Sequence, residues 1–184
     1  MLDKKQITEL NKTFASLNEA ERRVLIAEDV LKQIEVGAYR PLKGFYINDF
    51  TVTRVNTRTK SIQKLFDDIE CQCCALGACL LSTTKYKNKL VVDDVIELRS
   101  KSGAWKLLKD VFTSKQLLMI EYAFEGRFGG DRVGEDCFKD ELSFPEEKEC
   151  VEFGRNYVNS RPRLIAIMKN IIENKGEFIP TKND

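Results

Sequence analysis

The sequence predicts a mainly helical α+β fold, a single compact domain over residues 1–184 with at most a small β-sheet. Three observations favour this class. The chain has 184 residues, 42% of them hydrophobic, which suffices for one buried core and is short for two. Several helix-start signals precede apolar residues at helical spacing. Runs of β-branched and aromatic residues, which are typical of strands, are few.

Helix boundaries are marked by capping residues and glycines. In a capping box, a Ser or Thr side chain and a Glu or Gln three residues later each satisfy a free backbone N–H group at the helix start. Glycine often ends a helix, because it adopts the left-handed conformation without strain. The expected starts are Ser16 with Glu19, Thr113 with Gln116, Ser143 with Glu146, and Ser160; the expected ends are Gly37, Gly126 and a point near Asn174.

The cysteine-rich segment 73–81 is predicted to be a further helix. Its residues are all small or apolar, so the helix should be buried on every side, and Ala75, Gly77 and Ala78 should let a neighbouring backbone come close. The strand candidates are residues 45–47, 51–55 and 90–98, and loops are expected around 54–64, 82–89 and 126–143.

Charge and hydropathy limit the class of partner. Thirty Lys and Arg against 29 Asp and Glu give a net charge of +1, so no overall field attracts nucleic acid or an anionic membrane. No stretch approaches the roughly 18 apolar residues of a membrane span. We therefore expect a cytoplasmic protein, whose six cysteines are reduced rather than paired in disulfides.

Four of the six cysteines lie between positions 71 and 79, in a chain without histidine. The absence of imidazole removes the commonest base for a catalytic thiol and a frequent zinc ligand. Free cysteines pack well in a buried helix, and we favour this interpretation. Two alternatives remain open: a thiol enzyme that uses Cys73 or Cys74 at a helix N-terminus, and a zinc-stabilised interaction module held by Cys71, Cys74, Cys137 and Cys150.

Four arginines are the candidate ligand-binding residues. Arg127 and Arg132 lie in the glycine-rich segment 126–134, whose backbone N–H groups and guanidinium groups could surround an anion. Arg161 and Arg163 lie in the expected first turn of the last helix, where the helix dipole disfavours cations and a bound anion would relieve the conflict. The alternative is that the segment is a plain connection and that all four charges are solvated.

Residues 37–39 (Gly-Ala-Tyr), 44–46 (Gly-Phe-Tyr), 74–78 (Cys-Ala-Leu-Gly-Ala) and 176–178 (Gly-Glu-Phe) carry a resemblance. The chain resembles small uncharacterised phage and bacterial proteins in which a Gly-x-Tyr turn precedes a Cys-x-Leu-Gly-small helix. The resemblance covers the first half of the chain and the last helix. It implies a phage or mobile-element setting, in which short cytoplasmic proteins often bind and neutralise a host factor.

These observations together predict a binding protein rather than an enzyme. Its expected target is a host protein or a small anionic, nucleotide-like ligand, contacted by Arg127, Arg132, Arg161 and Arg163. We expect no catalytic residue, cofactor or metal. The sequence leaves open whether the chain forms homo-oligomers.

Overall fold

Helices dominate the structure, a computed structural model that describes residues 4–44, 46–48, 71–87, 103–127 and 142–180. This part contains seven α-helices: α1 (Lys4–Ser16), α2 (Glu19–Glu35), α5 (Ala75–Lys87), α6 (Gly103–Lys109), α7 (Ser114–Glu125), α8 (Phe144–Arg155) and α9 (Ser160–Glu173). It also contains three short strands: β1 (Tyr39–Pro41), β2 (Ile47–Asn48) and β3 (Cys71–Cys73). The predicted class, mainly helical α+β with a small sheet, is confirmed.

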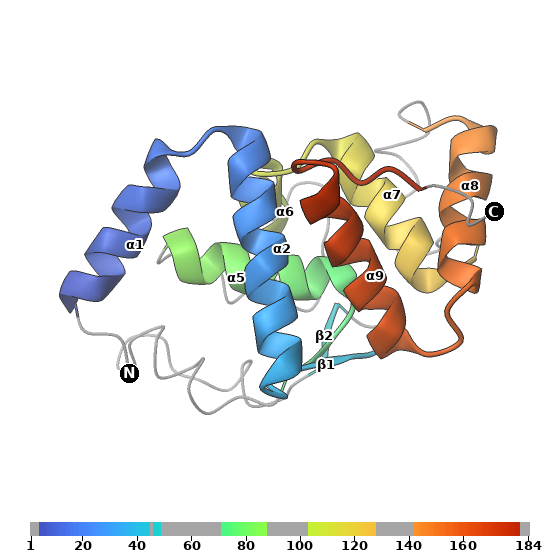
Figure 1. Ribbon diagram of the computed structural model, residues 1–184, viewed down its shortest axis with the longest axis horizontal. Helices are drawn as coiled ribbons and strands as arrows, with labels where there is room; N and C mark the ends of the chain where they lie inside the picture. Colours follow the sequence, from blue (N-terminus) through green and yellow to red (C-terminus); the bar gives the residue numbers. More distant parts are fainter. Residues whose placement is uncertain (1–3, 45, 49–70, 88–102, 128–141, 181–184) are drawn as a thin grey trace.

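The helices are arranged around α5, which lies across the middle of the molecule (Figure 1). Helix α1 packs near one end of α5, while α2, α6 and α7 pack along it. Helix α9 packs against both α2 and α7, and α8 packs against α7. After α9 the chain turns and runs across α7 toward α8 (Figure 1).

Two of the predicted capping boxes start helices at the expected residues. The Thr113 Oγ1 atom accepts a hydrogen bond from the Gln116 N–H at 3.1 Å, before α7. The Glu146 carboxylate accepts one from the Ser143 N–H at 2.9 Å, before α8. Gly126 ends α7 in the left-handed conformation, as predicted.

Two predicted caps are corrected. Ser16 does not start α2; it is the last residue of α1, a helix that the sequence signals did not indicate. The cap of α2 is Asn18, whose Oδ1 accepts from the Glu21 N–H at 2.9 Å while the Glu21 carboxylate accepts from the Asn18 N–H at 2.8 Å. Helix α9 is capped by Asn159, so Ser160 is its first residue and not its cap.

The sheet has β3 at its centre. Strand β1 pairs with β3 in parallel, with Tyr39 opposite Cys71, and β2 pairs with β3 antiparallel, with Ile47 opposite Cys73. Only Tyr46 and Ile47 of the three strand candidates fall within the described residues, and Ile47 begins β2. The candidates 51–55 and 90–98 and the expected loop 54–64 lie outside the described residues.

Helix α5 is buried around its whole circumference, as its composition predicts. Every residue from Ala75 to Thr84 is buried. A Cβ atom on Gly77 would lie 1.7 Å from the Tyr46 carbonyl oxygen. The backbone at Tyr46 therefore packs closely against α5 at Gly77, as expected. The loop predicted at 82–89 was wrong for its described part, because the helix continues to Lys87.

A buried ion pair joins α5 to α2. The Lys85 Nζ atom lies 2.5 Å from Asp29 Oδ1, and Gln33 Nε2 donates to the same oxygen at 3.2 Å. The Asp29 side chain is 3% exposed. Its second oxygen, Oδ2, is buried and has no hydrogen-bond partner among the residues that the structure describes.

Candidate functional site

The described cysteines lie in the core. Cys71, Cys73, Cys74, Cys79 and Cys150 are free thiols and all are buried. Cys74 precedes α5, and its Sγ atom accepts a hydrogen bond from the Gly77 N–H at 3.5 Å. The thiol therefore caps the first turn of α5 instead of facing solvent.

Burial raises the pKa values of four of these thiols, those of Cys73, Cys74, Cys79 and Cys150. Burial raises the pKa of Cys74 far above its ordinary value and raises the pKa values of Cys79 and Cys150 to about 12. A hydrogen bond with Cys71, together with burial, also raises the pKa of Cys73. Because the thiolate is the reactive form, this geometry gives no support to Cys73 or Cys74 as a nucleophile.

Only three of the four cysteines of the predicted zinc site lie within the described residues. Cys71, Cys74 and Cys150 are within the structure, whereas Cys137 lies outside the described residues. Among the described residues, no group of three or more His, Cys, Asp or Glu side chains is placed to hold a metal ion. The zinc-stabilised module therefore stays a prediction.

The end of α7 brings two of the four predicted arginines together. Arg127 follows the cap residue Gly126 and is exposed, with its Nη2 atom 3.9 Å from Glu125 Oε2. The Arg163 side chain lies against Gly126, because a Cβ atom there would be 2.6 Å from Arg163 Nη1. Arg161 is exposed in the first turn of α9, and Arg132 lies outside the described residues.

Arg163 is held by backbone carbonyls. It is 4% exposed, and its Nη1 atom donates to the Phe124 carbonyl oxygen at 2.8 Å. Its Nε and Nη2 atoms both donate to the Tyr157 carbonyl oxygen, at 3.2 and 2.5 Å. The bond to Phe124 satisfies a carbonyl oxygen at the C-terminal end of α7, where cations are stabilised by the helix dipole, and the bonds to Tyr157 tie Arg163 to the connection between α8 and α9. Arg163 thus has a fixed position beneath the surface rather than a free guanidinium group.

Lys43 is a candidate site residue that sequence reasoning missed. It is half-buried in the turn between β1 and β2, where the next residue, Gly44, donates its N–H to Glu125 Oε1 at 3.1 Å. Burial and the positive charges of Arg163 and Arg127 lower the pKa of Lys43, and Glu125 only partly offsets them. No ion pair or hydrogen bond to the Lys43 ammonium is present in the part of the chain that the structure describes. Gly44 indicates a turn in the sequence, but no neighbouring residue in the sequence indicates that this turn packs beside α7.

Two more charged groups complete the site. The Arg155 Nε atom donates to the Gly126 carbonyl oxygen at 3.3 Å. Glu121 Oε1 accepts a hydrogen bond from the Tyr46 hydroxyl at 3.0 Å, and burial raises the pKa of Glu121 to about 7. We call the following six residues the α7-end cluster: Lys43, Glu121, Glu125, Arg127, Arg155 and Arg163.

The α7-end cluster has an excess of positive charge. The cluster contains four cationic side chains and two carboxyl groups, and one of these carboxyl groups, that of Glu121, has its pKa raised to about 7 by burial. The carbonyl oxygens of Phe124 and Gly126, which form the negative end of α7, already accept hydrogen bonds from Arg163 and Arg155. The arrangement can therefore hold an anion against Lys43 and Arg127.

None of the helices in the described ranges combines the length and the apolar character required to cross a membrane. Comparison of the chain with known protein families, with curated proteins and with solved structures finds no match.

Proposed function

We propose that the protein acts by binding, and that it holds a small anionic ligand at the α7-end cluster. Lys43 and Arg127 make the direct contacts, while Arg155 and Arg163 fix the end of α7 and supply positive charge behind them. The observation that carries the proposal is the environment of Lys43. Its half-buried ammonium is within electrostatic range of Arg163, Glu125 and Arg127, with a net lowering of its pKa, and it has no ion pair within the described residues.

An anion would relieve this electrostatic conflict. Like charges at short distance disfavour the charged form of a lysine, and an opposite charge restores it. A phosphate or carboxylate group accepts several charge-assisted hydrogen bonds from Lys and Arg, so a nucleotide-like ligand suits the cluster. Sequestering such a ligand is an activity that would fit the phage or mobile-element setting implied by the resemblance.

The buried thiols favour binding over thiol catalysis. A catalytic cysteine needs an accessible sulphur and a lowered pKa. Cys73 and Cys74 are 0% and 4% exposed, and both have raised pKa values.

Thermal unfolding with a panel of anions tests the proposal. The panel is inorganic phosphate, pyrophosphate, a nucleoside monophosphate and a nucleoside triphosphate, each at constant ionic strength. A ligand at 100 times its Kd stabilises the folded state by about 2.7 kcal/mol, which for a chain of this size raises Tm by roughly 5–10 °C.

Lys43→Met is the informative variant, because it keeps the length of the side chain and removes the charge. Lys169→Met is the matched control, since Lys169 is exposed on α9. We expect the anion-dependent increase in Tm to be lost in Lys43→Met and kept in Lys169→Met. If no anion of the panel raises Tm, or if Lys43→Met responds like the wild type, the proposed site is wrong.

A further inference from the structure

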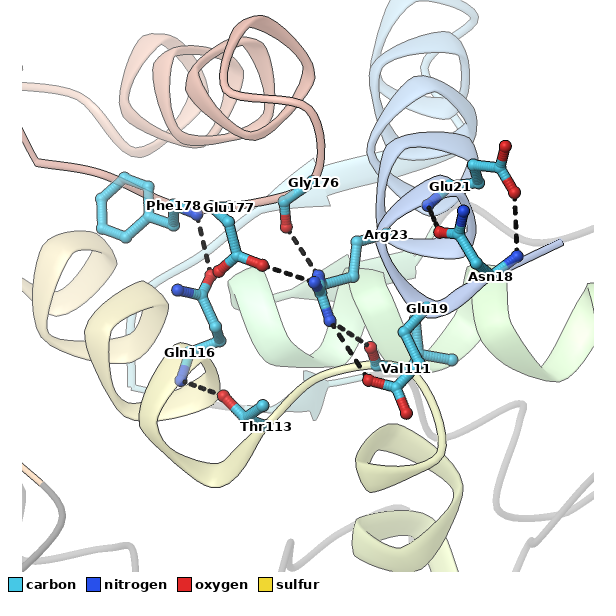
Figure 2. Close-up of polar contacts among 10 residues, drawn as sticks. All are labelled: Asn18, Glu19, Glu21, Arg23, Val111, Thr113, Gln116, Gly176, Glu177 and Phe178. Carbon is cyan, nitrogen blue, oxygen red and sulfur yellow. Dashed lines mark hydrogen bonds and ion pairs between the residues drawn. The ribbon is translucent and has the colours of Figure 1, made fainter.

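The C-terminal segment, residues 176–180, is held in place by side chains from four helices. Arg23 of α2 makes the central contacts (Figure 2). Its Nε atom donates to the Gly176 carbonyl oxygen at 2.7 Å, and its Nη2 atom pairs with the Glu177 carboxylate at 2.5 Å. Its Nη1 atom donates to the Val111 carbonyl oxygen at 3.2 Å. Arg23 is only 6% exposed, so its bonds to the Gly176 and Val111 carbonyl oxygens are buried, whereas the Glu177 carboxylate is partly open to solvent.

Side-chain amides hold the backbone of the next two residues. The Phe178 N–H donates to Gln116 Oε1 at 2.8 Å (Figure 2). The Ile179 N–H donates to Asn170 Oδ1 at 2.8 Å, and Asn170 Nδ2 donates to the Ile179 carbonyl oxygen at 2.7 Å. The Phe178 ring is 1% exposed and packs edge to face on Phe153, with ring centroids 5.2 Å apart.

We call Arg23, Gln116, Phe153 and Asn170 the clasp. Its members lie on α2, α7, α8 and α9. The clasp satisfies backbone groups and a buried ring of the segment, which is how proteins recognise an extended peptide. Recognition of this kind depends on the sequence of the segment and not on which chain supplies it.

The turn that leads into the segment is conformationally strained. The Gly176 N–H donates to the Ile171 carbonyl oxygen at 2.7 Å and the Lys175 N–H donates to the Ile172 carbonyl oxygen at 3.1 Å. This pair of bonds defines a Schellman motif, in which the left-handed position is usually glycine. Here the position is Lys175, with a φ of 54°. Because a side chain disfavours this conformation, opening the turn releases strain.

We infer that the clasp also accepts residues 176–180 of a second copy of the chain, so that two copies exchange their C-terminal segments and form a dimer. The exchange remakes every clasp contact, so the closed monomer and the exchanged dimer differ mainly in the turn at Lys175. Dimers of this type form when the hinge is short and strained. Figure 1 shows the end of α9 beside α2, and Gly176 lies against the Ala20 backbone at the start of α2. The inference does not depend on the α7-end cluster.

Substitution of Lys175 tests the role of the hinge. Lys175→Gly removes the left-handed penalty, which is worth about fivefold in an equilibrium constant for each hinge. Because two hinges open per dimer, Lys175→Gly should weaken dimerisation roughly 30-fold. Lys175→Pro cannot adopt a positive φ and lacks the N–H donor, so it should favour the dimer. Lys175→Val keeps the N–H and should shift the equilibrium in the same direction by less.

Light scattering after size-exclusion chromatography, at concentrations from about 1 µM to 1 mM, measures the monomer–dimer equilibrium. Each variant is refolded from urea at the final concentration so that slow exchange is complete. The expected order of dimer content is Pro, Val, wild type and Gly. If the Pro and Val variants both remain monomeric at the highest concentration, the inference is overturned.

A complementation experiment tests whether the clasp holds the partner's segment. In the Lys175→Pro background, one chain carries Asn170→Ala in the clasp and the other carries Phe178→Ala in the segment. Each chain alone lacks an intact pair, but a mixture contains one intact clasp and one intact segment. Native mass spectrometry should therefore show more heterodimer than the 2:1:1 ratio of heterodimer to each homodimer that random pairing gives. The random 2:1:1 ratio would show that the association does not use the clasp.

Discussion

Replacement of Gly77 by alanine tests whether the close approach of α5 to the sheet is as tight as the structure indicates. A Cβ atom at this position would lie 1.7 Å from the Tyr46 carbonyl oxygen and 2.7 Å from its carbonyl carbon. Ordinary van der Waals contact begins at 3.4 Å, so the two backbones would have to separate by about 1.7 Å. The obstructing atoms belong to the backbone and cannot rotate away.

The expected cost has three parts. Overpacking against fixed backbone costs up to about 3 kcal/mol. The separation also breaks the hydrogen bond from the Cys74 N–H to the Tyr46 carbonyl oxygen, 3.2 Å long, which contributes about 1 kcal/mol. Alanine regains about 1 kcal/mol over glycine in a helix. The net loss in the free energy of unfolding is therefore about 3 kcal/mol.

Gly37→Ala is the control, because it separates crowding from backbone strain. Gly37 has a φ of 81°, and a Cβ atom there meets no atom of the described residues within 4 Å, so the substitution should cost only about 1 kcal/mol of left-handed strain. In a chain of this size, Tm should fall by roughly 6–12 °C for Gly77→Ala and by roughly 2–4 °C for Gly37→Ala. Circular dichroism during heating measures both. If Gly77→Ala is no less stable than Gly37→Ala, the packing described for α5 is refuted.

Two further predictions concern titrating groups. Because burial raises the pKa of Glu121 from 4.5 to about 7, the folded protein binds an extra proton between these values and should lose stability as the pH rises through this window. Urea midpoints at pH 5 and pH 8 should show a smaller decline for Glu121→Gln than for the wild type or for the exposed control Glu149→Gln; an equal decline would contradict the assignment. Iodoacetamide at neutral pH should label the buried thiols at least about 100-fold more slowly in the folded protein than in urea. Rapid, selective labelling of Cys73 or Cys74, detected by peptide mass spectrometry, would restore the thiol-enzyme interpretation.

The sequence predicted local features of the fold well where a few neighbouring residues decide the structure. The starts of α7 and α8 follow from Thr113 and Ser143, and the end of α7 follows from Gly126. The start of α2 was misplaced because Ser16 and Asn18 both stand three residues before a glutamate. The choice between them depends on how far α1 extends, and the capping rule carries no information about that.

Features that depend on contacts between distant segments were not predictable. Residues 82–84 (Ser-Thr-Thr) suggest a loop by composition, but they are buried in α5, and tertiary packing overrides their weak helix propensity. Arg163 was expected at the surface, and its burial depends on the carbonyl oxygens of Phe124 and Tyr157. The charged environment of Lys43 could not be predicted from the sequence, because the groups around it come from α9 and from the end of α7.

The ion pair between Asp29 of α2 and Lys85 of α5 helps to fix the position of α5 against α2. Because α5 is buried around its circumference and carries mostly small or apolar side chains, hydrophobic packing alone distinguishes poorly between neighbouring orientations of this helix. Sliding it by one turn, or rotating it about its axis, would leave Asp29 charged in the interior without a cation, which is strongly unfavourable. The ion pair therefore makes one position and orientation of α5 against α2 much lower in free energy than the neighbouring ones.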